Sequence, residues 1–410
     1  MFRPWNVSVL VHSLPFFLYL GKFGSREVEG AMMHRFGLTI AGGGARGAHT
    51  AGVLRFLLTE FPRNFGQVPW PRVVSGTSVG ALNGYFAACH DDYELKRMTK
   101  IWTEMKTSDV YNLPGGGTLS LLKKTIQSVR LGALISNEPL RELILREASR
   151  RNLRKSILAG KCQAFIVSAT HLTSGTNVLF VDSADPDYWI EPPPHGRVVY
   201  TKIYPRHLLA SIAIPVVFPP ERIAGKLYVD GGVRQSAPVQ PMLESGMDRI
   251  VVLSTASNYL SPIGETDPEP SISLISGKAL DALSLDPVDR DTRVTEKINK
   301  IIRWGTEKYG DGFRFNLQEE LGIRELEMVH LGPSMDLGRL AVEVFEEEKI
   351  EGSTGAKWLL NKMYQQGEES GESDLLSHLL FDRCYTAEAE ALGFRDAKAQ
   401  EESLARLFTR

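Results

Sequence analysis

The 410-residue chain has few cysteines, little net charge and no apolar run long enough to cross a membrane. Cys89, Cys162 and Cys384 are too few and too scattered for a disulfide framework or a zinc knuckle. Three cysteines cannot all pair within one chain, which favours a reducing compartment. The formal net charge of −2 gives no reason to expect nucleic acid as a partner. We therefore expect a cytoplasmic protein that does not bind nucleic acid.

The N-terminal stretch 7–21, VSVLVHSLPFFLYLG, is strongly apolar but shorter than a spanning helix. It follows Arg3 as the apolar part of a secretory signal would, yet no clear cleavage site comes after it. Three alternatives stay open: a signal or interfacial segment, a helix packed on the body, or sequence upstream of a true start at Met32 or Met33. Residues 1–35 are therefore an N-terminal extension, and membrane association and secretion both remain open.

From Phe36 onward, short β-branched runs alternate with amphipathic helical patterns. Strands are expected at 36–41, 72–76, 163–170, 227–232 and 249–257, and helices at about 48–58, 79–89, 95–106 and 139–148. This alternation predicts a three-layer α/β/α domain with a mostly parallel central sheet over residues 36–258. Residues 259–410 are predicted to be a mostly helical extension packed on that domain, with a charged helix at 286–305 and one strand at 325–332.

The segment FGLTIAGGGARGAHTAGVLRFLL, residues 36–58, joins a strand to a helix through glycines. Gly42, Gly44 and Gly47 fit G-x-G-x-x-G, the phosphate-binding pattern of dinucleotide sites. The same turn could instead present bare backbone N–H groups to an oxyanion. A dinucleotide site would have an acidic residue about 20 positions later, at the end of a second strand. Glu60 comes too early for that role, so we expect no nucleotide cofactor.

The sequence GTSVG, residues 76–80, has the form G-x-S-x-G between an expected strand and an expected helix. A sharp turn at this point would project the Ser78 hydroxyl from the end of the sheet, where it could act as a nucleophile. The alternative is that Ser78 only caps the following helix. A nucleophilic serine also requires a base and an oxyanion hole.

Two kinds of residue could act as the base. The chain has nine histidines: His12, His34, His49, His90, His171, His195, His207, His330 and His378. His330 would suit a Ser-Asp-His order, but none of the nine has the recognisable surroundings of a base. Asp230 is the better candidate because it ends the strand KLYVD and precedes Gly231 and Gly232, at the sheet edge where sites of open α/β folds form. A plain Asp-Gly turn is the alternative.

Three motifs in order, GGGARG at 42–47, GTSVG at 76–80 and DGG at 230–232, resemble those of the patatin-like phospholipase family. ASIAIPVVFPP at 210–220 is similar to a further segment of that family. The resemblance implies a patatin-like fold, Ser78 as nucleophile and Asp230 as base. It also implies an oxyanion motif, a nucleophile elbow and a base loop, formed respectively by Gly42, Gly43, Gly44, Arg46 and Gly47; by Gly76 and Gly80; and by Gly231 and Gly232.

The resemblance further implies cleavage of fatty acyl esters of phospholipids or other lipids through an acyl-enzyme, without metal or cofactor. The expected partner is a lipid or membrane-surface substrate, and the oligomeric state stays open. The apolar helices expected around 95–106 and 119–135 could line an acyl channel, or could simply be core. Ser236 departs from the family pattern, which has asparagine there. A Ser-His-Asp α/β-hydrolase esterase and an inactive lipid-binding protein remain alternatives.

Overall fold

The computed structural model describes residues 36–66, 68–113, 135–148, 150–234, 238–257, 272–368 and 373–409. The N-terminal extension, the expected helix around 119–135 except for its last residue, and Ser236 lie outside these ranges. Residues 34–410 form one compact unit, so the predicted division at residue 258 stays a prediction. Within the described ranges, none of the helices is long and apolar enough to cross a membrane.

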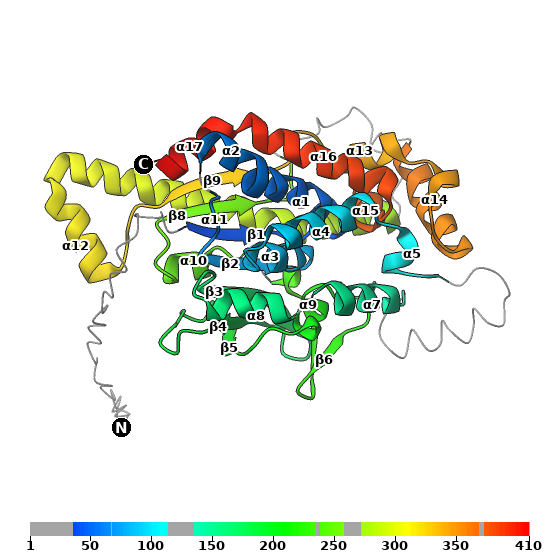
Figure 1. Ribbon diagram of the computed structural model, residues 1–410, viewed down its shortest axis with the longest axis horizontal. Helices are drawn as coiled ribbons and strands as arrows, with labels where there is room; N and C mark the ends of the chain where they lie inside the picture. The colour runs from blue at the N-terminus through cyan, green and yellow to red at the C-terminus, as the bar shows by residue number, and fades with distance from the viewer. Residues whose placement is uncertain are drawn as a thin grey trace, which may run out of the picture. The chain divides into compact units, whose positions relative to one another are not determined.

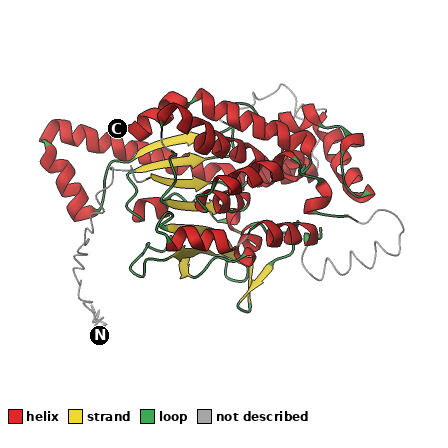
Figure 2. Cartoon of the chain, viewed as in Figure 1, coloured by secondary structure: helices red, strands yellow, loops and turns green. Residues whose placement is uncertain are grey.

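A central sheet of nine strands organises the fold (Figure 2). Seven strands lie in the order β5-β4-β3-β2-β1-β8-β9, and β7 pairs with both β3 and β6. Neighbours from β3 through β2, β1 and β8 to β9 are parallel, whereas β4 and β7 each run antiparallel to β3. The strands are β1 (Phe36–Ile40), β2 (Val73–Thr77), β3 (Ala164–His171), β4 (Thr176–Ser183), β5 (Gly196–Tyr200), β6 (Glu221–Ile223), β7 (Lys226–Asp230), β8 (Arg249–Leu253) and β9 (Glu327–Leu331).

Successive side chains of the central strands enter two different cores. Val74 and Val251 belong to the larger core, whereas their neighbours Val73 and Val252 belong to a smaller one. This alternation follows from the two-residue period of a strand, and burial of both faces explains why these segments are almost wholly apolar. The prediction of a mostly parallel sheet between helical layers is confirmed.

Helices cover both faces of the sheet (Figure 1). The α-helices are α1 (Gly47–Arg55), α2 (Phe61–Phe65), α3 (Val79–Ala88), α4 (Asp92–Thr103), α5 (Thr107–Val110), α7 (Glu138–Glu147), α8 (Arg150–Leu158), α9 (Pro205–Ser211), α10 (Gln240–Glu244), α11 (Ile272–Tyr309), α12 (Asp311–Leu321), α13 (Leu337–Val344), α14 (Thr354–Glu368), α15 (Asp374–Leu379), α16 (Arg383–Ala399) and α17 (Glu401–Thr409). Short turns of other helix types lie at Gly44–Arg46, Phe56–Glu60, Gly231–Val233 and Glu347–Lys349.

The C-terminal part of the chain packs closely on α1, the helix that follows the glycine-rich turn at 42–47 (the glycine turn). In Figure 1, the red helix α16 runs along the blue helix α1. A Cβ atom on Gly52 of α1 would lie 1.9 Å from the carbonyl oxygen of Glu390, and one on Gly393 of α16 would lie 1.9 Å from that of His49. The two backbones can approach this closely only because both contact positions are glycine.

Several elements differ from the sequence predictions. Helix α11 begins at Ile272 and therefore starts well before the predicted helix at 286–305. Helix α4 starts three residues early, at Asp92, because the Asp91 side chain accepts a hydrogen bond from the Tyr93 amide and caps it. The short strands β5 and β6 were not predicted. The predicted strand at 325–332 is confirmed as β9, parallel to β8.

Candidate active site

Strand β3 brings Ser78 and Asp230 together, although they are far apart in sequence. Thr77, the last residue of β2, pairs with Ser168 in a parallel ladder. Asp230, the last residue of β7, pairs with the next β3 residue, Ala169, in an antiparallel ladder. Strands β2 and β7 therefore meet end to end along β3. Ser78 and Asp230 line one small cavity, and the Ser78 side chain is near enough to the Asp230 carboxyl to lower its pKa.

The backbone at Ser78 is strained, with φ 55° and ψ −132°. This left-handed geometry is unusual for a residue with a side chain, and it turns the chain sharply from β2 into α3. The turn also needs close backbone contacts, since a Cβ on Gly76 would lie 2.4 Å from the Gly80 oxygen. The Ser78 side chain makes no capping hydrogen bond to α3, so the capping alternative is wrong.

Ser211, the last residue of α9, holds the turn at Ser78 through two hydrogen bonds. Its hydroxyl accepts a hydrogen bond of 2.8 Å from the Ser78 amide and donates one of 2.6 Å to the Ser168 carbonyl. Ser211 is fully buried. The sequence analysis included it in the segment 210–220 but gave it no role, because nothing in the local pattern shows which backbone group a serine will meet.

Asp230 is buried, with a relative exposure of 6%. Its carboxyl accepts a 2.7 Å hydrogen bond from the Gly232 amide. Burial raises the pKa of Asp230 to about 6, and the nearby Ser78 side chain and the hydrogen bond from Gly232 limit the rise. Gly231 lies against β3, where a Cβ would lie 2.6 Å from the Ser168 oxygen. Gly231 and Gly232 thus let the chain that follows Asp230 lie close to β3.

The glycine turn lies beside Ser78 with its carbonyls directed away. The Gly42 oxygen accepts a 2.6 Å hydrogen bond from the Thr255 hydroxyl, and the Gly43 oxygen lies 3.0 Å from Nδ1 of His378. The Gly43 and Gly44 N–H groups donate no hydrogen bond within the part of the chain that the structure describes. Both glycines are buried and line a small cavity together with Ser78 and Asp230. Gly43 and Gly44 have φ of 155° and 57°, which favours glycine.

Gly47 and Arg46 complete the turn in different ways. Gly47 opens α1 against Val79, and a Cβ there would lie 2.5 Å from a Val79 methyl carbon. The Arg46 guanidinium is buried and points away from Ser78. It bonds the side chains of Ser377, Asp281 and Asp374, at 2.7, 2.7 and 3.0 Å. Arg46 therefore ties the glycine turn to the C-terminal helices, with its charge neutralised by two carboxylates.

None of the ring-nitrogen hydrogen bonds found for the described histidines involves Ser78. His49 pairs with Asp396, and His207 accepts a hydrogen bond from the Tyr204 amide. His330 lies in β9, with β8 and β1 between it and β2. His378 lines the same small cavity as Ser78 but bonds Gly43 and Asp281. This arrangement provides no Ser-His pair at position 78.

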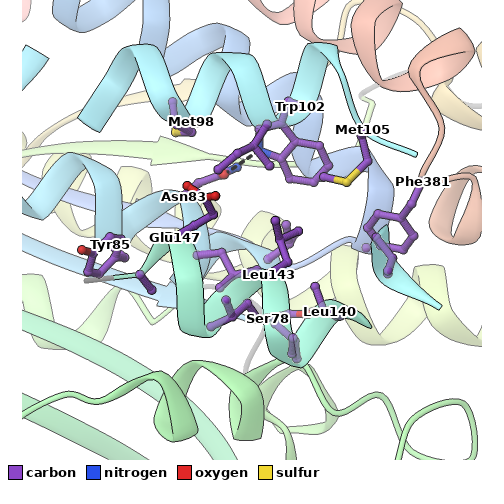
Figure 3. A pocket seen from close by; sticks show the side chains of 18 of the residues that line it. Ser78, Asn83, Tyr85, Met98, Trp102, Met105, Leu140, Leu143, Glu147 and Phe381 are labelled. Atoms are coloured by element: carbon purple, nitrogen blue, oxygen red, sulfur yellow. Dashed lines mark hydrogen bonds between the residues drawn. The ribbon is translucent and has the colours of Figure 1, made fainter. Parts of the chain in front are cut away.

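An apolar pocket opens beside Ser78, with about 740 Å³ of empty space including its mouth. Trp102 of α4 and Leu143 of α7 point into this space, together with Met105 and Phe381, which lie just after α4 and α15 (Figure 3). The Trp102 ring is held in place because its Nε1 donates a 2.9 Å hydrogen bond to Asn83. The expected helix around 95–106 therefore lines the pocket. The expected helix around 119–135 lies almost wholly outside the described residues.

The Cys89, Cys162 and Cys384 thiols are free, as the sequence predicted. Among the described residues, no group of three or more acidic, cysteine or histidine side chains is placed to hold a metal ion.

Comparison with known proteins identifies the family. The family model "Patatin-like phospholipase" matches residues 38–243, about half of the chain, including all three motifs. Among solved structures, VipD from Legionella pneumophila is similar at 13% identity and a TM-score of 0.36, over 90% of this chain and 67% of VipD. The match to the family model, with the fold described above, shows that this chain belongs to the patatin-like phospholipase family.

Proposed function

We propose that the protein is a serine acyl hydrolase that cleaves fatty acyl esters of lipids through Ser78 and Asp230. One arrangement carries the proposal: Ser78 and the buried carboxyl of Asp230 line one small cavity together with backbone N–H groups that donate no hydrogen bond within the described part of the chain. Membership of the family supports ester hydrolysis of lipids in general. Within that general activity, we propose a role for each of several residues.

In the first step, Asp230 accepts the Ser78 proton as the serine oxygen attacks the ester carbonyl. A carboxylate with its ordinary pKa is a weak base at neutral pH. Burial raises the pKa of Asp230 to about 6, which brings it closer to the working range of a general base. The alcohol leaves with a proton returned from Asp230, and an acyl-Ser78 ester remains.

The negative charge that develops on the ester oxygen needs donors that are already in place. Among the described residues the Gly43 and Gly44 N–H groups have no partner, and both glycines line the cavity that contains Ser78. Such preorganised donors stabilise an oxyanion without reorganising during the reaction. Arg46 acts on this turn indirectly, through the C-terminal residues that its guanidinium binds.

In the second step, Asp230 activates water, which attacks the acyl-Ser78 ester and releases the fatty acid. The acyl chain occupies the apolar pocket beside Ser78, since the lining is almost entirely hydrocarbon. We propose that lipid at a membrane surface is the substrate. The cytoplasmic location stays a prediction from the cysteine content.

The test combines active-site labelling with hydrolysis. A fluorophosphonate probe should label Ser78, as located by peptide mass spectrometry. Fatty acid release should be measured from phospholipid, lysophospholipid and p-nitrophenyl esters. Ser78→Ala should abolish labelling and release, and Asp230→Asn should lower the rate by about 10²- to 10⁴-fold.

Ser174 offers a matched control, because its hydroxyl lies 2.7 Å from a ring nitrogen of His171 on an exposed turn. Ser174→Ala should leave labelling and hydrolysis unchanged. Equal rates for wild type, Ser78→Ala and Asp230→Asn would refute the proposal. A folded wild-type protein that binds lipid but is neither labelled nor active would instead be an inactive lipid-binding member of the family.

A further inference from the structure

We propose that His378 and Thr255 are positioning residues that aim two backbone N–H groups at the reacting ester oxygen, by holding the carbonyls of the glycine turn. The inference rests on the proposed function and assigns roles outside the three motifs. Thr255 follows β8 and His378 lies in α15, so both come from beyond the region that the family model matches.

The peptide unit is planar, so holding its carbonyl oxygen also fixes the direction of its N–H group. The C=O of one residue and the N–H of the next belong to one rigid trans unit and point in opposite directions. Holding the Gly42 oxygen therefore fixes the Gly43 N–H, and holding the Gly43 oxygen fixes the Gly44 N–H. Glycine rotates freely about φ and ψ, and the turn's own hydrogen bond, from the Arg46 amide to the Gly43 oxygen, is long at 3.2 Å, so side-chain donors add to its stiffness.

Thr255 holds the first peptide unit. Its hydroxyl donates a 2.6 Å hydrogen bond to the Gly42 oxygen, and its side chain is 1% exposed. A Cβ on Gly43 would lie 2.4 Å from the Thr255 hydroxyl oxygen. Thr255 therefore fits against the turn closely enough to fix one carbonyl and to exclude other conformations of the next residue.

His378 holds the second peptide unit. Its Nδ1 lies 3.0 Å from the Gly43 oxygen, so this contact is a hydrogen bond when Nδ1 carries a proton. Nε2 lies 3.0 Å from Asp281, the carboxylate that also binds Arg46, so both ring nitrogens face acceptors and both contacts are hydrogen bonds in the imidazolium form. A Cβ on Gly44 would lie 2.3 Å from the His378 backbone oxygen. Helix α15 thus forms one wall of the turn.

The test uses pairs of variants that differ in one donor. In His378→Asn, the amide can place an N–H near the position of Nδ1. In His378→Gln, the amide reaches toward the position of Nε2 and leaves the Gly43 oxygen without its side-chain donor, while the Arg46 amide still bonds that oxygen at 3.2 Å. Thr255→Ser keeps the hydroxyl, and Thr255→Val replaces it with a methyl group of similar size. Each variant should be assayed with a short-chain p-nitrophenyl ester for kcat and KM, and for its rate of labelling by a fluorophosphonate.

His378→Gln and Thr255→Val should each lower kcat by about 100-fold with little change in KM, since misdirected donors affect the transition state. Labelling rates should fall in parallel, because the phosphonyl oxygen occupies the same place. His378→Asn and Thr255→Ser should stay within about 10-fold of wild type. Thermal unfolding of each pair should differ by only a few degrees, which separates orientation from loss of fold.

Two results would overturn the inference. One is wild-type kcat in folded His378→Gln and Thr255→Val. The other is an equal loss in both members of a pair, which would show that shape rather than the donor matters. If wild type itself is not labelled at Ser78, the proposed function fails first and this inference fails with it. Labelled wild type with fully active Gln and Val variants removes only the roles of His378 and Thr255.

Discussion

The backbone N–H of Ser78 donates its hydrogen bond to the hydroxyl of Ser211, at 2.8 Å. This amide is therefore committed to holding the turn and is not free to stabilise an oxyanion. Beside Ser78, the N–H groups of Gly43 and Gly44 donate no hydrogen bond to any other described residue and can face an oxyanion. The contact thus separates two tasks: Ser211 keeps the nucleophile in its strained backbone geometry, and the glycine turn faces the substrate.

Ser211→Ala should both destabilise the protein and slow the reaction. The variant leaves the buried Ser78 amide and Ser168 carbonyl without a partner, which costs about 1–3 kcal/mol of unfolding free energy. A displaced nucleophile should lower kcat by about 10- to 100-fold. Denaturant unfolding and ester hydrolysis measure the two effects. Ser156→Ala is the matched control, because the buried Ser156 hydroxyl has no hydrogen-bond partner. A Ser211→Ala variant as stable and active as that control would contradict the role of Ser211.

The pH profile should follow the ionisation of Asp230. Because burial raises the pKa of Asp230 to about 6, the base is protonated and inactive below that pH. We expect kcat/KM to rise about tenfold per pH unit below 6 and to level above it. A histidine base could give a similar midpoint, so the profile should be repeated at two temperatures. A carboxyl pKa changes little on warming, whereas an imidazole pKa falls. A midpoint near 4, or one that moves as an imidazole would, would exclude Asp230 as described.

The same pKa shift predicts that Asp230→Asn stabilises the protein at neutral pH. The folded-state pKa lies above the ordinary value of 3.8, so ionisation of Asp230 between about pH 4 and pH 6 destabilises the fold. Removing the charge should raise the unfolding free energy at pH 8 by up to about 3 kcal/mol. The gain should shrink as the pH falls from 6 to 4 and vanish at about pH 3, where the carboxyl is protonated in both states. Urea unfolding at the two pH values tests this, and an equal effect at both would refute it.

Filling the apolar pocket should change acyl-chain preference. Leu143 of α7 lines the pocket, whereas Leu145 on the same helix is 57% exposed and points outward. Leu143→Phe should lower kcat/KM for p-nitrophenyl palmitate by about tenfold or more, since the added ring occupies space needed by a long chain. Activity on the butyrate ester should change less. Leu145→Phe should alter neither, and a palmitate-to-butyrate ratio that is the same in both variants would mean that the pocket does not hold the chain.

Gly80 and Gly312 should respond in opposite ways to alanine. A Cβ on Gly80 would lie 2.3 Å from the Ile40 oxygen and 2.5 Å from the Ala41 oxygen, both rigid backbone atoms. Gly80→Ala should cost several kcal/mol or prevent folding. Gly312 has open space around it in α12, so Gly312→Ala should stabilise that helix by up to about 1 kcal/mol. Thermal unfolding of both variants compares the two, and a Gly80→Ala protein as stable as wild type would show that α3 can move away from β1.

The strand ends and turns that depend on neighbouring residues were predicted well from the sequence. Ser78 and Asp230 each follow a short apolar run, and glycines mark the turns, so both could be placed at strand ends. The end-to-end meeting of β2 and β7 on β3 could not be predicted, because antiparallel pairing of β7 depends on tertiary packing. The long helix α11 was placed too short, since its first residues lack a strong amphipathic pattern.

The supporting residues were missed for a different reason. His378 appeared in the sequence only as one of nine histidines, and Thr255 only as part of an expected strand. The role of each residue depends on which backbone carbonyl it contacts in the fold. His378 is 335 positions from Gly43 in the sequence. Similarly, Arg46 was expected to add positive charge beside the oxyanion donors. Its charge is instead paired with the carboxylates of Asp281 in α11 and Asp374 in α15.

The contacts between the glycine turn and α15 also bear on when activity can arise during synthesis. A growing polypeptide that has emerged only as far as α14 already contains both members of the Ser78–Asp230 pair. It still lacks the histidine ring, the arginine partners on α15 and the helix that clamps α1. Residues 374–399, which form α15 and α16, must therefore also leave the ribosome before the turn is held, so a nascent chain that already contains both Ser78 and Asp230 does not yet have a complete site.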